Sequence, residues 1–129
     1  MNMPHIAAGA VIYVKDLARL AKFYEIVSDL KVREIDNSHI RLESDAFQLV
    51  ILQVPKRIAN SIEICEPPLP RENTAIKLVF FVESISAARD RIRALGGDLN
   101  ASEKEWKYGS HTVCDGHDPE GNIFQLRQV

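Results

Sequence analysis

Hydrophobic residues in the first half of the chain follow a strand pattern, then a helical pattern, then strand patterns again. Residues 6–14 are small and apolar, which is typical of a strand buried on both faces. Asp16 suits a helix N-cap, and apolar residues then recur at helical spacing over Leu17–Ser28. Three further short strands are predicted, over residues 32–35, 39–42 and 47–54. The predicted order of elements is therefore β-α-β-β-β.

Residues 55–73 break this pattern. The run Pro67-Pro68-Leu69-Pro70 can continue neither a helix nor a central strand, because proline lacks the backbone N–H that both structures use. The segment is therefore interpreted as a linker between two halves of the chain. Within it, residues 58–62 fit either a turn of helix or an edge strand.

The first pattern then starts again. A buried strand is predicted over residues 76–82, Ser84 stands where Asp16 stood, and a helix runs from Ile85 to the Gly-Gly pair at 96–97. Strand-like pieces follow, at residues 98–100, 110–115 and 123–128. The tripeptide Phe-Gln-Leu closes both copies, at residues 47–49 and 124–126. Residues 118–122, Asp-Pro-Glu-Gly-Asn, fit a type I turn before the last strand.

An internal repeat of this kind predicts an α+β fold built from two βαβββ modules. Each module has one helix to cover its sheet, so two modules, either in one chain or across a dimer, are expected to form a concave mixed sheet with the helices outside. The predicted organisation is a single domain over residues 1–129, divided into module 1 (5–54), the linker (55–73) and module 2 (74–129).

Composition adds few constraints on function. The 129 residues carry a net charge of −2, which gives no reason to expect nucleic acid or an anionic membrane as a partner. Cys65 and Cys114 form no Cys-x-x-Cys motif and are predicted to be reduced thiols. No apolar run reaches membrane-spanning length and the N-terminus has no basic region, so a cytoplasmic protein is expected.

Several of these motifs together resemble the vicinal oxygen chelate superfamily, which includes glyoxalase I, extradiol dioxygenases, fosfomycin-resistance enzymes and bleomycin-resistance proteins. The motifs are the paired modules, the Val-x-Asp-Leu helix start at 14–17 followed by Phe23-Tyr24, the Gly-Gly pair, and the closing Asp-Pro-Glu-Gly-Asn. Trp106 stands where such proteins often carry an aromatic residue. The resemblance implies a small-molecule cavity on the concave sheet and a homodimer.

The resemblance also implies four metal-ligand positions, one on the first and one on the last strand of each module, normally His or Glu. In this sequence they fall on Gly9, Gln48, Lys77 and Gln125. Glycine has no side chain, protonated lysine has no lone pair, and glutamine is a weak ligand for a transition metal. The histidines match none of these positions; they are His5, His39, His111 and His117. No cofactor is therefore expected, and a divalent metal held by a different ligand set is the alternative.

Strand alternation predicts which of the remaining side chains reach the cavity. The predicted ligand-binding residues are Tyr13, Gln48, Val50, Lys77, Phe81, Trp106, Gln125 and Arg127. Lys77 is the strongest candidate, as the binder of an anion or carbonyl or as a catalytic group; the alternative is a strand-end lysine that reaches solvent.

Each of the other candidates also has a structural alternative. The glutamines could bond a ligand or satisfy each other, Arg127 could be a solvated charge, and Tyr13 and Phe81 could be core residues. His111 and His117 are six residues apart and share a strand face. They could form a surface metal site or supply a general base; the alternative is that both are solvated side chains. Residues 103–108 form either a rim loop over the cavity or an ordinary surface loop.

Three functions fit these observations. The first is a protein that binds a small anionic or neutral molecule in a metal-free cavity; bleomycin fits poorly, because a basic drug requires an acidic cleft. The second is an enzyme of lyase or dioxygenase type, either metal-dependent through another ligand set or metal-free through Lys77. The third is a protein without a ligand, whose role is to dimerise.

Overall fold

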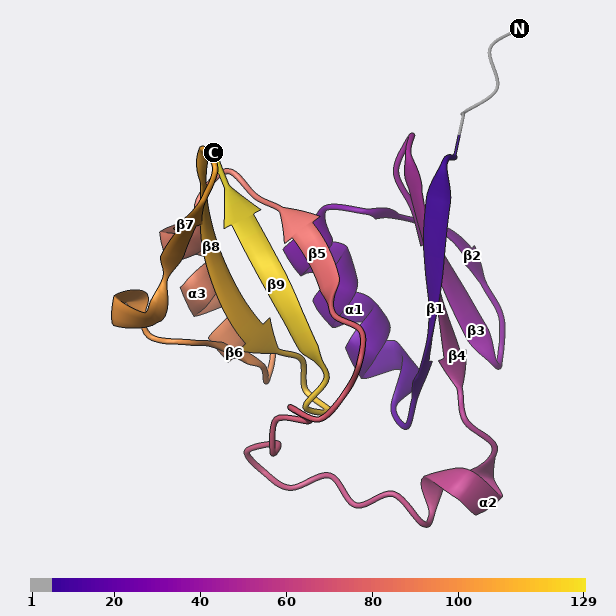
Figure 1. Cartoon of the computed structure of the whole chain (residues 1–129). Coiled ribbons are helices and arrows are strands. Elements are labelled where there is room, and N and C mark those ends of the chain that lie inside the picture. Colours follow the sequence, from indigo (N-terminus) through magenta and orange to yellow (C-terminus); the bar gives the residue numbers. More distant parts are fainter. Residues whose placement is uncertain (1–5) are drawn as a thin grey trace, which may run out of the picture. The chain divides into compact units, whose positions relative to one another are not determined.

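The computed structural model describes residues 6–129, so His5 lies outside the described residues. The chain divides into two compact units, Met1–Glu63 and Ile64–Val129, with the boundary inside the predicted linker. Each unit contains one βαβββ-like module with its own mixed sheet, the second with one additional short strand, which confirms the predicted α+β class and the internal repeat (Figure 1). Within the described residues, no helix has the length and apolar character needed to cross a membrane.

The first unit forms a four-stranded sheet in the order β1-β4-β3-β2, in which β1 is parallel to β4 and the other pairs are antiparallel. Its elements are β1 (Ala8–Val14), α1 (Leu17–Ser28), β2 (Lys31–Ile35), β3 (His39–Glu43), β4 (Phe47–Gln53) and α2 (Lys56–Ala59). Helix α1 begins and ends as predicted, and the Asp16 side chain accepts a hydrogen bond from the Arg19 N–H at 3.2 Å. Helix α1 packs on β3 and β4, and its most deeply buried side chains are Leu20, Phe23 and Tyr24. For residues 58–62 the sequence allowed either a turn of helix or an edge strand; the first two of them belong to the short helix α2.

The second unit forms a sheet in the order β5-β9-β8-β6, with β7 paired to β8. Its elements are β5 (Leu78–Phe81), α3 (Ile85–Ala94), β6 (Asp98–Leu99), the 3₁₀ helix η1 (Ser102–Lys104), β7 (Trp106–Tyr108), β8 (His111–His117) and β9 (Ile123–Gln128). Strand β5 is parallel to β9 and antiparallel pairing joins β8 to β9.

Two predictions for this unit need correction. Strand β5 begins at Leu78, so Lys77 precedes the strand instead of lying within it. Residues 103–108 are not a loop: Gly109, at a φ of +62°, and Ser110 close a tight hairpin in which Trp106–Tyr108 pairs with β8. The alternation of Trp106, Lys107 and Tyr108 covers only three residues, which is too short for the sequence to predict a strand.

The two faces of the second sheet differ in chemistry. Phe124 and Leu126 are fully buried on the face that packs against α3, which lies behind the sheet in Figure 1. The alternate residues of β9 and β8, among them Asp115, Gln125 and Arg127, lie on the opposite face, called here the open face. The core is thus on the α3 side, and polar groups gather on the other.

The closing Asp-Pro-Glu-Gly-Asn segment is the turn that connects β8 to β9. The Gly121 N–H donates to the Asp118 carbonyl at 2.9 Å, which closes the predicted turn. The Asp118 side chain is fully buried, and its Oδ1 accepts from the backbone N–H groups of Glu120 at 2.8 Å and Asn122 at 3.0 Å. The Gly121 carbonyl in turn accepts from the Arg71 N–H at 2.8 Å, so the turn also holds the connection that leads to Lys77.

We expect Gly121→Ala to destabilise the protein more than Gly109→Ala. Both glycines have positive φ, +86° and +62°, so both alanines lose about 1–2 kcal/mol of conformational energy. Only at Gly121 would the new Cβ also meet backbone, 2.2 Å from the Leu69 oxygen, whereas Gly109 has open space around it. Urea unfolding should therefore show a loss of at least about 3 kcal/mol for Gly121→Ala. Equal losses for the two variants would contradict the close packing of Gly121 against the Leu69 backbone.

Candidate functional site

A continuous row of polar side chains crosses the open face of the second sheet. The Lys77 ammonium lies 2.8 Å from Asp115 Oδ2, Gln125 Nε2 donates to Asp115 Oδ1 at 3.1 Å, and Arg127 Nε donates to Gln125 Oε1 at 2.8 Å. The row, called here the polar row, exists because β8 and β9 pair with Asp115 directly opposite Gln125. Gln125 is only 7% exposed, and both ends of its amide are satisfied within the row.

A cavity of about 290 Å³ lies at the Lys77 end of the polar row. Its lining includes Glu72, Lys77, Asn100, Asp115, His117 and Ile123. His117 Nδ1 lies 3.0 Å from the Asp118 carbonyl oxygen, which can only accept, so Nδ1 carries the proton. In the neutral imidazole, Nε2 is then left as an acceptor.

Aromatic residues surround the other end of the polar row. The guanidinium carbon of Arg127 lies 5.0 Å from the ring centroid of Tyr108 and 6.0 Å from that of Phe81. The rings of Phe81 and His111 meet edge to face at 5.5 Å. Phe81 and Tyr108 are each 62% exposed, an unusual state for large aromatic side chains on a sheet.

The first unit carries a similar arrangement on the corresponding face of its own sheet. Strand pairing sets Glu43 opposite Gln48, and Gln48 Nε2 donates to Glu43 Oε2 at 2.8 Å. Arg41 Nε lies 3.2 Å from the same carboxylate oxygen. The repeat therefore extends from the backbone to a carboxylate paired with a glutamine in each module. Of the other predicted residues in this unit, Val50 pairs with Val11, and Tyr13 is 66% exposed.

The structure places the predicted site residues in two groups, one per unit. Lys77, Phe81, Gln125 and Arg127 share the open face of the second sheet, and Trp106 joins them on β7, opposite Val113. Sequence reasoning missed Asp115, the residue that links Lys77 to Gln125. Counting outward from the turn at 118–122 as a hairpin would have found it, because the strand register is symmetrical about that turn.

The match with known proteins follows the same architecture. A family model described as "Glyoxalase-like domain" matches residues 9–127, so the chain belongs to this family, within the vicinal oxygen chelate superfamily. This confirms the family that the sequence motifs indicated. The search of curated proteins finds no match.

Solved structures share the fold over nearly the whole chain. A glyoxalase-related enzyme from Fulvimarina pelagi matches with a TM-score of 0.67 and 16% identity, covering 98% of this chain and 89% of that one. A fosfomycin resistance protein from Listeria monocytogenes matches with a TM-score of 0.63 and 16% identity, covering 100% and 93%. A glyoxalase/bleomycin resistance protein from Albidiferax ferrireducens matches with a TM-score of 0.63 and 18% identity, covering 96% and 98%. Identities this low show a common fold only.

The residues at the four positions that the sequence resemblance predicted for metal ligands do not fit a metal ion. A Cβ built on Gly9 would lie 2.7 Å from the Gln48 backbone oxygen, so no ligand side chain fits there without a backbone shift. Gln125 and Lys77 are held within the polar row, and Gln48 is hydrogen-bonded to Glu43. Among residues 6–129, no group of three or more His, Cys, Asp or Glu side chains is placed to hold a metal.

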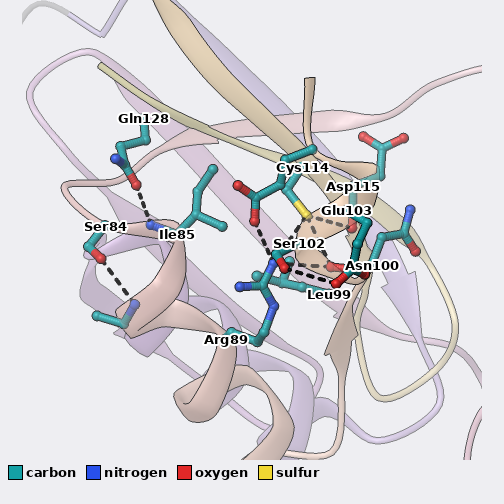
Figure 2. A network of polar contacts seen from close by, with 12 residues as sticks. Ser84, Ile85, Arg89, Leu99, Asn100, Ser102, Glu103, Cys114, Asp115 and Gln128 are labelled. Atoms are coloured by element: carbon teal, nitrogen blue, oxygen red, sulfur yellow. Dashed lines mark hydrogen bonds and ion pairs between the residues drawn. The ribbon is translucent and has the colours of Figure 1, made fainter. Parts of the chain in front are cut away.

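A second polar network lies on the α3 side of the sheet and belongs to the scaffold (Figure 2). Arg89 on α3 lies 2.7 Å from Glu105 Oε2 and 3.9 Å from the Cys114 sulfur, which contacts the Asn100 carbonyl at 3.4 Å. The Cys114 side chain is fully buried, and this burial raises the pKa of its thiol. The network joins α3 to β8 and contributes no group to the open face.

We expect the two thiols to react very differently. Both cysteines are free, but Cys65 is exposed and Cys114 is buried with a raised pKa, so little of it is thiolate at about pH 8. An aromatic disulfide reagent should titrate one thiol per native chain quickly and the second only in denaturant. Cys65→Ser, the control, should remove the fast reaction. Rapid reaction of both thiols in the native protein would contradict the buried position of Cys114.

Proposed function

We propose that this glyoxalase-like protein binds a small anionic or neutral molecule on the open face of its second sheet, without a metal ion. The observation that carries the proposal is the polar row beside the cavity. Binding sites for small molecules combine apolar walls with a few fixed polar groups. Here Ile123 contributes apolar surface to the cavity, and Lys77 contributes a cation whose position Asp115 fixes.

The charge of the polar row favours an anion or a neutral molecule over a cation. Lys77 and Arg127 bring two positive charges to the row and Asp115 brings one negative charge; Glu72 adds a carboxylate to the cavity lining, so the excess positive charge lies at the Arg127 end. Of the three donor positions on the Lys77 ammonium, one is used by Asp115, so the others can serve a ligand oxygen. The buried amide of Gln125 hydrogen-bonds both Asp115 and Arg127, so the polar row is already ordered before a ligand binds.

A second candidate function is acid–base catalysis, which His117 favours. Its Nδ1 is held by the Asp118 carbonyl, and its ring lines the same cavity as Lys77. Nε2 would take a proton from a carbon next to a carbonyl group, and the C–H electron pair would move into an enolate. The Lys77 ammonium would stabilise the enolate oxygen, and the imidazolium would return the proton to carbon. Lys77 would then act as the electrophilic group of a metal-free enzyme.

The binding proposal is tested with a thermal-shift screen of untagged protein in EDTA. Small carboxylates, ketones and amides form the library, and at least one class should raise the melting temperature by about 2 °C or more at millimolar concentration. Ile123→Trp, which fills the cavity, should abolish that shift. Ile58→Trp is the matched control, because Ile58 is exposed on α2 in the other unit.

Two results would overturn this proposal. One is a complete absence of ligand-dependent shifts. The other is a shift that appears only after Zn, Ni, Mn or Fe is added and bound near one equivalent per chain. The latter would mean that a ligand set other than Gly9, Gln48, Lys77 and Gln125 holds a metal.

The catalytic candidate is tested by hydrogen exchange at carbon. Dihydroxyacetone in D₂O, followed by proton NMR, should gain deuterium faster with the protein than in buffer alone. His117→Gln should lower the protein-dependent rate about a hundredfold. His111→Gln is the matched control, because His111 lies on the same strand face but outside the cavity lining. Exchange at the buffer rate, or exchange that survives His117→Gln, would count against catalysis.

The homodimer and the cytoplasmic location implied by the sequence stay predictions. Superfamily members bind small molecules, which agrees with the proposed kind of partner.

A further inference from the structure

The Arg127 end of the polar row combines a guanidinium with exposed aromatic rings, and this combination suits one chemical class of ligand. We infer that it recognises the carboxylate of a planar aromatic acid, with Phe81 and Tyr108 as the walls for the ring. This inference rests on the proposed function and names the ligand class for the same open face. It assigns the main binding role to Arg127, where the sequence had favoured Lys77.

The donors of Arg127 are only partly used. Its Nε donates to Gln125 Oε1 at 2.8 Å, and no ion pair of Arg127 occurs within residues 6–129. Its two terminal nitrogens therefore present a planar pair of N–H donors with no carboxylate in place. A guanidinium edge of this kind matches the two oxygens of a carboxylate, and such bidentate pairs are the stronger hydrogen bonds of proteins.

The aromatic residues around the guanidinium favour a flat ligand. Tyr108 and Phe81 lie 5.0 and 6.0 Å from the guanidinium carbon, and more than half of each side chain is open to solvent. An aromatic acid can place its carboxylate on the Arg127 edge while its ring covers these exposed side chains. Offset or edge-to-face ring contacts of this type add about 0.5–1.5 kcal/mol beyond the area they bury. A compact anion such as phosphate would use the charge but leave the rings uncovered.

Charge separates the two ends of the polar row. At the Lys77 end, Asp115 neutralises the ammonium at 2.8 Å, and Glu72 adds a second carboxylate to the cavity lining. At the Arg127 end the neighbours are the neutral amide of Gln125 and the aromatic rings. An anion is therefore attracted to Arg127, while Lys77 is left to hydrogen-bond a neutral oxygen.

The hydrogen bond to Gln125 fixes the position of the Arg127 side chain. Gln125 is 7% exposed, and its amide is oriented by Asp115, so its Oε1 offers one direction of approach to Arg127 Nε. A guanidinium held in this way loses less side-chain entropy on binding than a free surface arginine. Lysine at this position would keep the charge but lose both the bond to Gln125 and the planar donor edge.

The test is a calorimetric titration of untagged protein in EDTA with benzoate, benzamide and cyclohexanecarboxylate. Benzoate should bind most tightly, because benzamide lacks the charge and cyclohexanecarboxylate lacks the flat ring. Arg127→Lys should weaken benzoate binding about tenfold, and Tyr108→Leu about fivefold. Arg93→Lys is the control and should change nothing, because Arg93 lies on α3, away from the open face.

Equal benzoate affinity in Arg127→Lys and the unmodified protein would overturn the inference, and so would equal binding of benzoate and cyclohexanecarboxylate. If other compounds of the screen still bind in an Ile123-dependent way, the proposed function stands and only the ligand class fails. Light scattering completes the test: a change of molecular mass in Tyr108→Leu or Phe81→Leu would assign the aromatic surface to contact between copies and would likewise overturn the inference.

Discussion

The buried side chain of Asp118 is the constraint on which the site depends. By accepting from two backbone N–H groups of its own turn, at 2.8 and 3.0 Å, it fixes where β8 ends and β9 begins. That fixes the strand register, which sets Asp115 opposite Gln125 and so creates the polar row. The same turn receives the connection at Arg71 and offers the Asp118 carbonyl that orients His117. The closing motif at residues 118–122 thus positions the side chains of the polar row and contributes no side chain to that row.

Within the polar row, Gln125 connects the charged side chains of Arg127 and Asp115. Its buried amide accepts from Arg127 and donates to Asp115, which in turn pairs with Lys77. The amide has both a donor and an acceptor, so it can join a carboxylate on one side to a guanidinium on the other through hydrogen bonds. Gln48 has the same relation to Glu43 in the first unit. Each module therefore contains a carboxylate hydrogen-bonded to a glutamine amide on the strand opposite it.

The two modules share this pair but differ around it. In the first unit the arginine of the set, Arg41, lies on β3 beside its carboxylate, so its charge is largely neutralised there. In the second unit the arginine lies on β9, away from the carboxylate and among aromatic rings, so its charge and its terminal N–H groups are available. The same backbone repeat thus gives one surface whose arginine is paired with a carboxylate and one whose arginine is not, which is why both proposals concern the second sheet.

The sequence by itself determined the repeat, the family and the bounds of α1 and β9, because hydrophobic periodicity, N-caps and turn residues act over a few neighbouring positions. The prediction that the positions aligned with metal ligands carry poor ligands also came from the sequence, since it depends only on residue types. Tertiary structure decided which side chains meet. Asp115 lies 38 residues from Lys77 along the chain, and Trp106–Tyr108 became a strand only through pairing with β8. Such contacts depend on strand register and on hairpin closure, which bring distant residues together with a geometry that no local pattern records.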